Sequence, residues 1–410
     1  MSFTNRSLSF IIPNRRFLLF GFLLTFASSF GQTYFISLFS AKIRQDFDLS
    51  HGDFGTLYAV ATLASAVTLI WLGRKVDDHD LRGFALFVTL GLGLACALMA
   101  WSPSLLVLGL AIYALRLFGQ GLTGHTAAIG MARYFDRTRG MALSISGLGY
   151  PLGEAVFPFA AVSLMAYLSS GQLWGSIALF VLFVITPLIQ VLLIGHAARH
   201  QRHLNRTHTD AAKTTSTRQF SRRDVLKDRN CYVILLVILA PAFIVTGVFF
   251  HQVHLVEIKG WQLSWFAAAF IAFAISQVAS SLIAGALIDR RNALGLLPRF
   301  LLPLSAGLMV LAVIDNPLAI PIFMLLGGAT SGAATTISGA LWAEIYGVTH
   351  LGAIKALTVA FMVFATALSP AMLGWMIDGG ISVSSILGGM ALYSVAASLF
   401  TGWWFRNGIR

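Results

Sequence analysis

Charged residues are scarce in this chain: Asp, Glu, Lys and Arg make up 11% of its 410 residues, where a soluble domain carries about 25%. Hydrophobic residues make up 57%, and the mean hydropathy is +0.79. A single water-soluble core cannot bury so much apolar sequence, which excludes a soluble globular protein. The composition predicts an integral membrane protein.

Cysteine is nearly absent, since the chain has only Cys96 and Cys231, far apart in sequence. This excludes a disulfide framework and a cysteine-based metal site. Four of the ten histidines fall in a basic central loop, where contact with solvent explains them better than a metal does (His196, His200, His203 and His208). We expect neither a metal nor another cofactor.

Two classes of motif are also missing. The chain contains no G-x-x-x-x-G-K-[ST] sequence, which argues against ATP-driven pumping. Ser, His and Asp are nowhere grouped at a spacing that suggests nucleophilic catalysis. We therefore do not expect an enzyme.

Long apolar runs are what the chain does have. Runs of about 18 to 25 residues can cross the hydrocarbon core of a bilayer as helices, and they are continuous rather than alternating, which favours helices over a barrel. The sequence predicts an all-α integral membrane fold of twelve spans, at about 16–40, 54–76, 83–100, 104–131, 140–166, 172–195, 230–254, 264–288, 297–314, 318–343, 353–377 and 384–405.

The net charge of +12 follows the predicted topology. All but four of the 28 Lys and Arg residues fall at the termini or in loops that join even to odd spans; the exceptions are Lys42, Arg44, Lys259 and Arg116. Such a bias places both termini in the cytoplasm. The basic balance thus indicates orientation and contact with anionic lipid headgroups rather than nucleic-acid binding, and it fits a multi-pass protein of the inner (plasma) membrane.

One long polar stretch divides the chain, which predicts a six-helix bundle at 1–195, a cytoplasmic linker at 196–229 and a second bundle at 230–410. An offset of 212 residues pairs positions across the two bundles: Gly73 with Gly285, Asp77 with Asp289, Tyr134 with Tyr346, Gly140 with Gly352, and Pro158 with Pro370. Five pairs at one register indicate internal duplication. Two like-oriented, pseudo-symmetric six-helix halves are typical of secondary transporters, whose substrate site lies near the bilayer midplane.

These features resemble the major facilitator superfamily over essentially the whole chain. "GRKVDDHDLR" (73–82) and "GALIDRR" (285–291) are similar to the family's cytoplasmic loop motif, and "RLFGQG" (116–121) to its fourth-span motif. The resemblance implies a monomeric transporter with a cytoplasmic gate at Gly73, Asp77, Arg82, Gly285, Asp289 and Arg290. Asp78 and Asp80 depart from the first copy of the motif.

Two further stretches resemble the monocarboxylate-transporter and oxalate–formate-exchanger branch. They are "YFDRTRGMALSISGLGYPLG" (134–153) and "SSFGQTYFISLFSAKIRQDFDLS" (28–50). Monocarboxylate carriers commonly place an Asp and an Arg four residues apart in span eight, where this chain has Gln277 and Ser281. The departure weakens the inference of a lactate-like substrate carried by those same groups.

Two charged residues, Arg116 and Glu154, fall well inside predicted spans. A charge at this depth costs about 2.5–3.5 kcal/mol and needs a physical reason. At a rise of about 1.5 Å per residue, they lie about 24 Å and about 21 Å from the connector between spans four and five. Three interpretations stay open: a permanent ion pair; an anion-binding Arg116 with a proton-binding Glu154; or a Glu154 at the lipid edge.

The resemblance implies that spans one, four, seven and ten line the central cavity. It therefore adds candidate substrate-binding residues to Arg116, namely Gln32, Tyr34, Gln120, Thr246 and, from span eight, Gln277. We expect a secondary transporter of a small polar, anionic, monocarboxylate-like solute, driven by H⁺ or by exchange. Two alternatives stay open: a proton-driven efflux antiporter, and a transporter-shaped ligand sensor.

Overall fold

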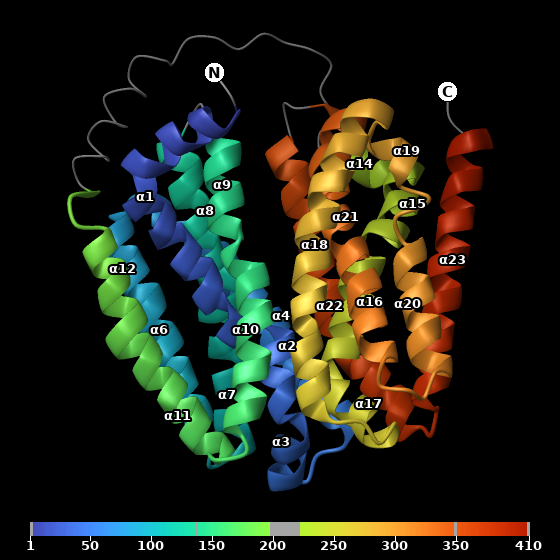
Figure 1. Ribbon diagram of the computed structural model, residues 1–410, viewed down its shortest axis with the longest axis horizontal. Helices are drawn as coiled ribbons and strands as arrows, with labels where there is room; N and C mark the ends of the chain where they lie inside the picture. The colour runs from blue at the N-terminus through green and yellow to red at the C-terminus, as the bar shows by residue number, and fades with distance from the viewer. Residues whose placement is uncertain (1–2, 136–137, 197–221, 348–350, 408–410) are drawn as a thin grey trace. The chain divides into compact units, whose positions relative to one another are not determined.

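The computed structural model describes residues 3–135, 138–196, 222–347 and 351–407. Most of the predicted 196–229 linker and the side chain of Asp77 lie outside the described part. All regular structure in those ranges is helical (Figure 1). Ten helices are long and apolar enough to cross a membrane by length and composition. With the pair α9 (Arg139–Gly147) and α10 (Gly149–Leu164) and the shorter α20 (Leu302–Val313), they agree with the predicted twelve-helix membrane fold.

The chain divides into two compact units. Unit 1 contains residues 1–35, 64–157 and 164–216, and unit 2 contains residues 36–63, 158–163 and 217–410. The second half of the first span and the first half of the second span are thus grouped with the C-terminal helices.

The helices of unit 1 begin with α1 (Phe3–Ala27), which packs on α8 (Thr123–Tyr134) and α9. Polar side chains at the ends start several helices; Asp80, for example, accepts hydrogen bonds from the Arg82 and Gly83 amides. The other elements are η1 (Ser28–Gly31), α2 (Thr33–Ile36), the end of α4 (His51–Leu72), whose first half belongs to unit 2, α5 (Lys75–Asp78), α6 (Leu81–Ala100), α7 (Leu105–Ala114), η3 (Leu115–Leu122), α11 (Ser170–Phe180), η4 (Val181–Ile185) and α12 (Thr186–Leu192).

Unit 2 is built around two long helices, α18 (Leu263–Arg291) and α21 (Ala319–Tyr346), which pack along each other. The helix α20 packs on both α21 and α23 (Val383–Asn407) (Figure 1). The remaining elements are η2 (Ser37–Phe39), α3 (Ser40–Phe47), α14 (Arg222–Lys227), α15 (Arg229–Ile238), α16 (Ala240–Phe250), α17 (Gln252–Ile258), α19 (Ala293–Leu296) and α22 (Leu351–Asp378).

Glycine allows α18 and α21 to approach closely at Gly332, where a Cβ atom would clash with the backbone carbonyl of Gln277. We expect Gly332→Ala to destabilise the protein by about 1–3 kcal/mol, as overpacking does. Gly339 lies in the same helix, and a Cβ atom there would meet nothing within 4 Å. Thermal unfolding in detergent should therefore show a lower midpoint for Gly332→Ala but not for Gly339→Ala. Equal midpoints for the two variants would contradict the close contact.

Candidate functional site

The first span is not one continuous helix. After α1, the chain tightens into η1, and Gln32 adopts an extended conformation with φ −83° and ψ 151° before α2 begins. The polar residues Gln32, Thr33 and Tyr34 therefore lie at a helix break rather than on a helix face. Irregular backbone inside a membrane protein exposes hydrogen-bonding groups, and transporters use such breaks to bind solutes.

The fourth span carries a second irregularity that faces the first. Residues Leu115–Leu122 form a π-helix, η3, which packs on η1. A Cβ atom on Gly31 would lie 2.7 Å from the Cα atom of Gly119 and would also clash with the Leu115 carbonyl. Only glycine permits this contact of backbone with backbone. π-Helical segments are frequent at functional sites.

Arg116 lies at this junction, and its side chain is 1% exposed. The Nη1 atom of Arg116 donates a hydrogen bond of 3.0 Å to the carbonyl oxygen of Gly31. The guanidinium is thereby held at the break in the first span by a charge-assisted hydrogen bond to a backbone carbonyl.

Glu154 belongs to the same unit and reaches this region from α10. Ser29 and the carbonyl of Phe26 fill the space that a Cβ atom on the preceding Gly153 would need, so α10 lies directly against the first span there. The Glu154 carboxyl acts electrostatically on the hydroxyl of Tyr34, which is 5% exposed. Its Oε2 atom is buried and has no hydrogen-bond partner among the described residues.

Arg116 and Glu154 differ in their hydrogen-bonding surroundings. Arg116 contacts the backbone of the first span, whereas the Glu154 carboxyl keeps one buried oxygen without a donor. A buried carboxylate in this position is costly unless it takes up a proton or a cation approaches it.

The other predicted binding residues are distributed over both units. Gln32 Nε2 donates to Ser28 Oγ at 2.9 Å, and Gln120 lies in η3 with its backbone nitrogen against Gly31. Thr246 in α16 and Gln277 in α18 are half-buried in unit 2. Unit 1 therefore brings Arg116, Glu154, Gln32, Tyr34 and Gln120 to the helix break. Thr246 and Gln277 belong to the other unit.

The predicted cytoplasmic gate residues make few contacts in the described parts. The Gly73 carbonyl lies 3.0 Å from Nε2 of His125, and Arg82 Nε donates to Gln190 Oε1 at 3.2 Å. Asp289 and Arg290 are exposed at the end of α18, and neither has a hydrogen bond or ion pair within the described ranges. A Cβ atom on Gly285 would lie 3.9 Å from the methyl group of Thr336, an ordinary van der Waals distance.

Sequence reasoning missed a second cluster, in unit 2, where the start of α4 packs on the end of α22. Asp378 Oδ2 accepts from the Gly52 amide at 2.7 Å, and its Oδ1 accepts from the His51 amide at 3.1 Å. Gly55 lies against the Pro370 carbonyl, and Gly374 against the backbone of His51 and Gly52. We call these contacts the α4–α22 seal. Gly52, Gly55 and Gly374 are visible in the sequence, but no sequence pattern indicated which helix each of them contacts.

Buried polar bonds continue the seal along η2 and α17. Gln252 Nε2 donates to Ser37 Oγ at 2.7 Å, and Ser37 Oγ donates to the Phe249 carbonyl at 2.7 Å. Because both side chains are fully buried, these bonds fix the second half of the first span against the seventh.

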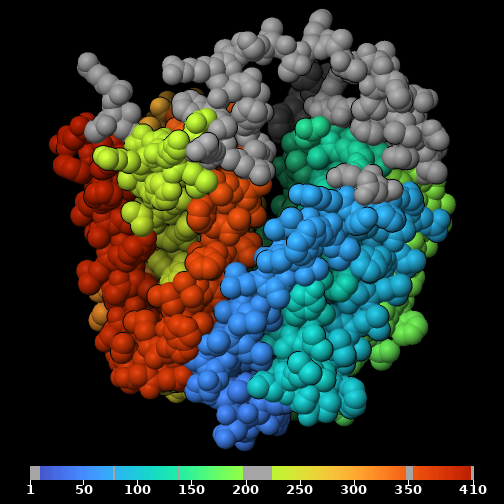
Figure 2. Space-filling view, turned by 180° about the vertical axis from the view of Figure 1, so that it is seen from behind, coloured from blue at the N-terminus to red at the C-terminus, as the bar shows by residue number. Residues whose placement is uncertain are grey.

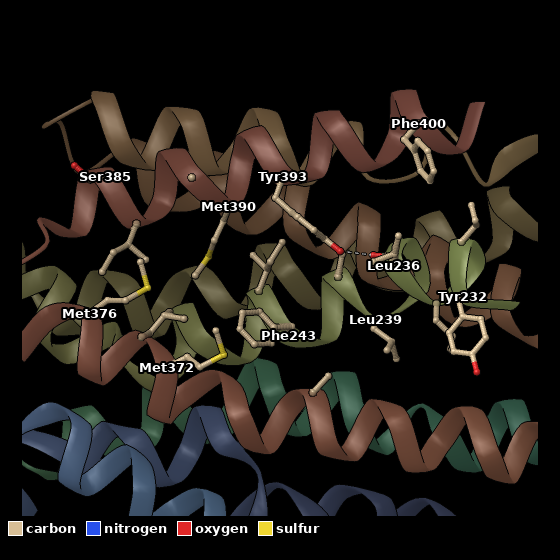
Figure 3. A pocket seen from close by; sticks show the side chains of 18 residues that line it. Tyr232, Leu236, Leu239, Phe243, Met372, Met376, Ser385, Met390, Tyr393 and Phe400 are labelled. Carbon is tan, nitrogen blue, oxygen red and sulfur yellow. Dashed lines mark hydrogen bonds between the residues drawn. The ribbon is translucent and has the colours of Figure 1, made fainter. Parts of the chain in front are cut away.

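A separate groove of about 720 Å³ runs between α22 and α23, over α15 and α16 (Figure 2). Its lining is apolar, with Leu, Met and Phe side chains pointing inward, and no charged residue lines it (Figure 3). The hydroxyls of Tyr393 and Tyr232 donate to the carbonyls of Leu236 and Leu226. The groove thus offers few polar groups to a hydrophilic solute. Arg116 remains the better candidate for binding such a solute.

Comparisons with known proteins agree with the fold. One similar solved structure is a bacterial homologue of the human lysosomal transporter Spinster, with 15% identity, a TM-score of 0.66, and coverage of 96% of this chain and 97% of that one. Another is the nucleoside transporter NupG, with 11% identity, a TM-score of 0.70, and coverage of 95% and 99%. A search of curated protein sequences returned no match.

The profile that describes the Major Facilitator Superfamily matches residues 21–327. This range runs from the first predicted span into the tenth and includes both copies of the loop motif. It also agrees with the all-helical, multi-pass fold. The chain therefore belongs to the major facilitator superfamily of membrane transporters, and it is not an enzyme.

Proposed function

We propose that this transporter is a secondary active carrier of a small organic anion, and that Arg116 binds the anionic group. The observation that supports this most is the buried guanidinium at the junction of two irregular helical segments, bonded to the Gly31 carbonyl. A planar guanidinium can bind a carboxylate through two parallel hydrogen bonds. Gln32, Tyr34 and Gln120 supply further polar groups nearby, and Thr246 and Gln277 supply groups from the other half of the chain.

Glu154 is the proposed proton-coupling residue. The Oε2 atom of Glu154 is buried and accepts no hydrogen bond from the described residues. The carboxylate therefore favours uptake of a proton whenever no cation lies close enough to neutralise it during the transport cycle. The carrier then takes up its anion with H⁺ or exchanges it for another solute. The monocarboxylate-like branch belongs to this proposal, with the reservation that Gln277 and Ser281 replace the charged pair of those carriers.

The proposal also covers the two halves of the chain, its orientation in the membrane and its gates. Two six-helix halves, 1–195 and 230–410, alternate access to the site, joined by the 196–229 linker, and the protein works as a monomer in the inner (plasma) membrane. The basic loops keep both termini cytoplasmic. The α4–α22 seal then lies at the outer end. Gly73, Asp77, Arg82, Gly285, Asp289 and Arg290 form the cytoplasmic gate.

A ligand screen tests the substrate class. We expect thermal unfolding of the purified protein to shift upward with at least one small carboxylate, since a ligand that binds only the folded state stabilises it. Nucleosides serve as the uncharged comparison, because a similar structure is that of a nucleoside transporter, and a cationic dye represents efflux substrates. A shift with nucleosides or the dye alone would refute the anion proposal.

A further inference from the structure

Three histidines gather at the α4–α22 seal, although they come from different parts of the sequence. The ring centroids of His51 and His254 are 4.1 Å apart, and those of His51 and His251 are 5.8 Å apart. With Ser40, Arg44, Phe54 and Phe250, they line one small void. The nitrogen Nε2 of His251 lies 3.1 Å from the Pro370 carbonyl. The cluster therefore contacts both helices that make the seal.

Charged side chains from α3, α4, α17 and α22 surround the histidine cluster. Arg44 comes from α3, Glu257 from α17 and Asp378 from α22, and Arg44 interacts electrostatically with both carboxylates. Asp53 of α4 is exposed and bonded to the Ser50 amide. Asp378 is already engaged by two amides of α4, so its capacity to stabilise additional positive charge is reduced.

We propose that His51, His251 and His254 form a proton-binding site that opens the outer seal when it is occupied. In the closed arrangement the imidazoles are packed against one another and beside the Arg44 guanidinium. Protonation places like charges a few ångströms apart in a partly buried space, which is unfavourable. Separation of α4 from α22 relieves this repulsion and hydrates the rings.

The direction of the pH effect follows from this arrangement. Burial lowers the pKa of His254, and the Arg44 guanidinium lowers it further, while Asp378 acts in the opposite direction. A group whose pKa is lowered in the closed state stabilises that state fully above its ordinary value of about 6.5. The stabilisation is lost as the pH falls below that value. Acid outside the cell therefore opens the seal.

The inference rests on the outward placement of the seal in the proposed function, but its test needs no substrate. Spin labels at Gln45→Cys and Ser384→Cys, two exposed positions of unit 2, report the separation across the seal by double electron–electron resonance. Cys96 and Cys231 are replaced by alanine. We expect the short-distance population to fall at least about twofold between pH about 8 and about 5.5, where histidine titrates.

The triple variant His51→Gln, His251→Gln and His254→Gln should keep the short distance at both pH values. His254→Gln alone gives a smaller response and serves if the triple variant does not fold. The control His79→Gln, whose ring lies against the Lys75 carbonyl, should respond like the parent. A parent that ignores pH, or a triple variant that responds fully, overturns the inference. Absence of an anionic ligand in the screen refutes the proposed substrate and leaves this result unaffected.

Discussion

Replacement of Arg116 by alanine is expected to reduce anion affinity about 100-fold and to abolish uptake into proteoliposomes. Hydrogen bonds to charged groups contribute about 1.5–3 kcal/mol each, and each 1.4 kcal/mol corresponds to a factor of ten in affinity. Arg116→Lys keeps the charge but lacks the two parallel donors. We therefore expect the lysine variant to bind more weakly than the parent and more tightly than the alanine variant.

The measurement is uptake of the labelled carboxylate identified by the screen, corrected for folded protein by thermal unfolding. Arg133→Ala is the matched control, because Arg133 donates to the Val76 carbonyl in α5 and should leave affinity unchanged. If the alanine variant does not fold, the same uptake measurement is made with Arg116→Lys instead. Parental affinity in a folded Arg116 variant would show that the guanidinium does not bind the solute.

Glu154→Gln is expected to remove accumulation driven by a pH gradient while preserving counterflow of the same solute. Glutamine has nearly the shape of a protonated glutamate, so the binding geometry survives, but it cannot release the proton. Counterflow needs only the loaded carrier to cross in both directions, whereas net uptake needs the empty carrier to return.

Both modes should be measured in the same proteoliposomes, with and without an imposed pH gradient. Asp46→Asn makes the same acid-to-amide change at an exposed residue that pairs with Lys42, and it should retain gradient-driven uptake. If Glu154→Gln accumulates solute as the parent does, another group carries the proton. If it loses counterflow as well, Glu154 holds the structure or binds the solute.

The sequence predicted the helical membrane fold well because apolar run length is a local property. The length of each apolar run reports a requirement of the bilayer that needs no tertiary information. Three successive polar residues in the first apolar run, Gln32, Thr33 and Tyr34, coincide with the helix break.

Features that depend on tertiary contact were not predictable. Counting residues placed Arg116 and Glu154 at a similar depth in the membrane. It could not tell which way their side chains point, because the π-helix at 115–122 departs from the regular α-helical rotation per residue on which such a count depends. One hydrogen-bond acceptor of Arg116 is the backbone carbonyl of Gly31, and a backbone group has no side-chain signature in the sequence.

The α4–α22 seal illustrates the same limit. His51, His251 and Asp378 are separated by more than a hundred residues along the chain, and no periodicity links them. Asp378 stands at the end of an apolar run, where a polar residue needs no special reason. Its two bonds to the start of α4 are visible only after the helices are packed.

The placement of Arg116 and Glu154 in one unit also has an electrical consequence. On the proposed cycle, the empty site carries one positive and one negative charge, which sum to zero. With a bound monoanion and a protonated Glu154, the sum is again zero. Moving one net charge across the membrane would couple each step to the potential by about 2.3 kcal/mol per 100 mV. A site with this pair of groups moves its solute with no net charge in either direction, so the proton gradient alone sets the accumulation.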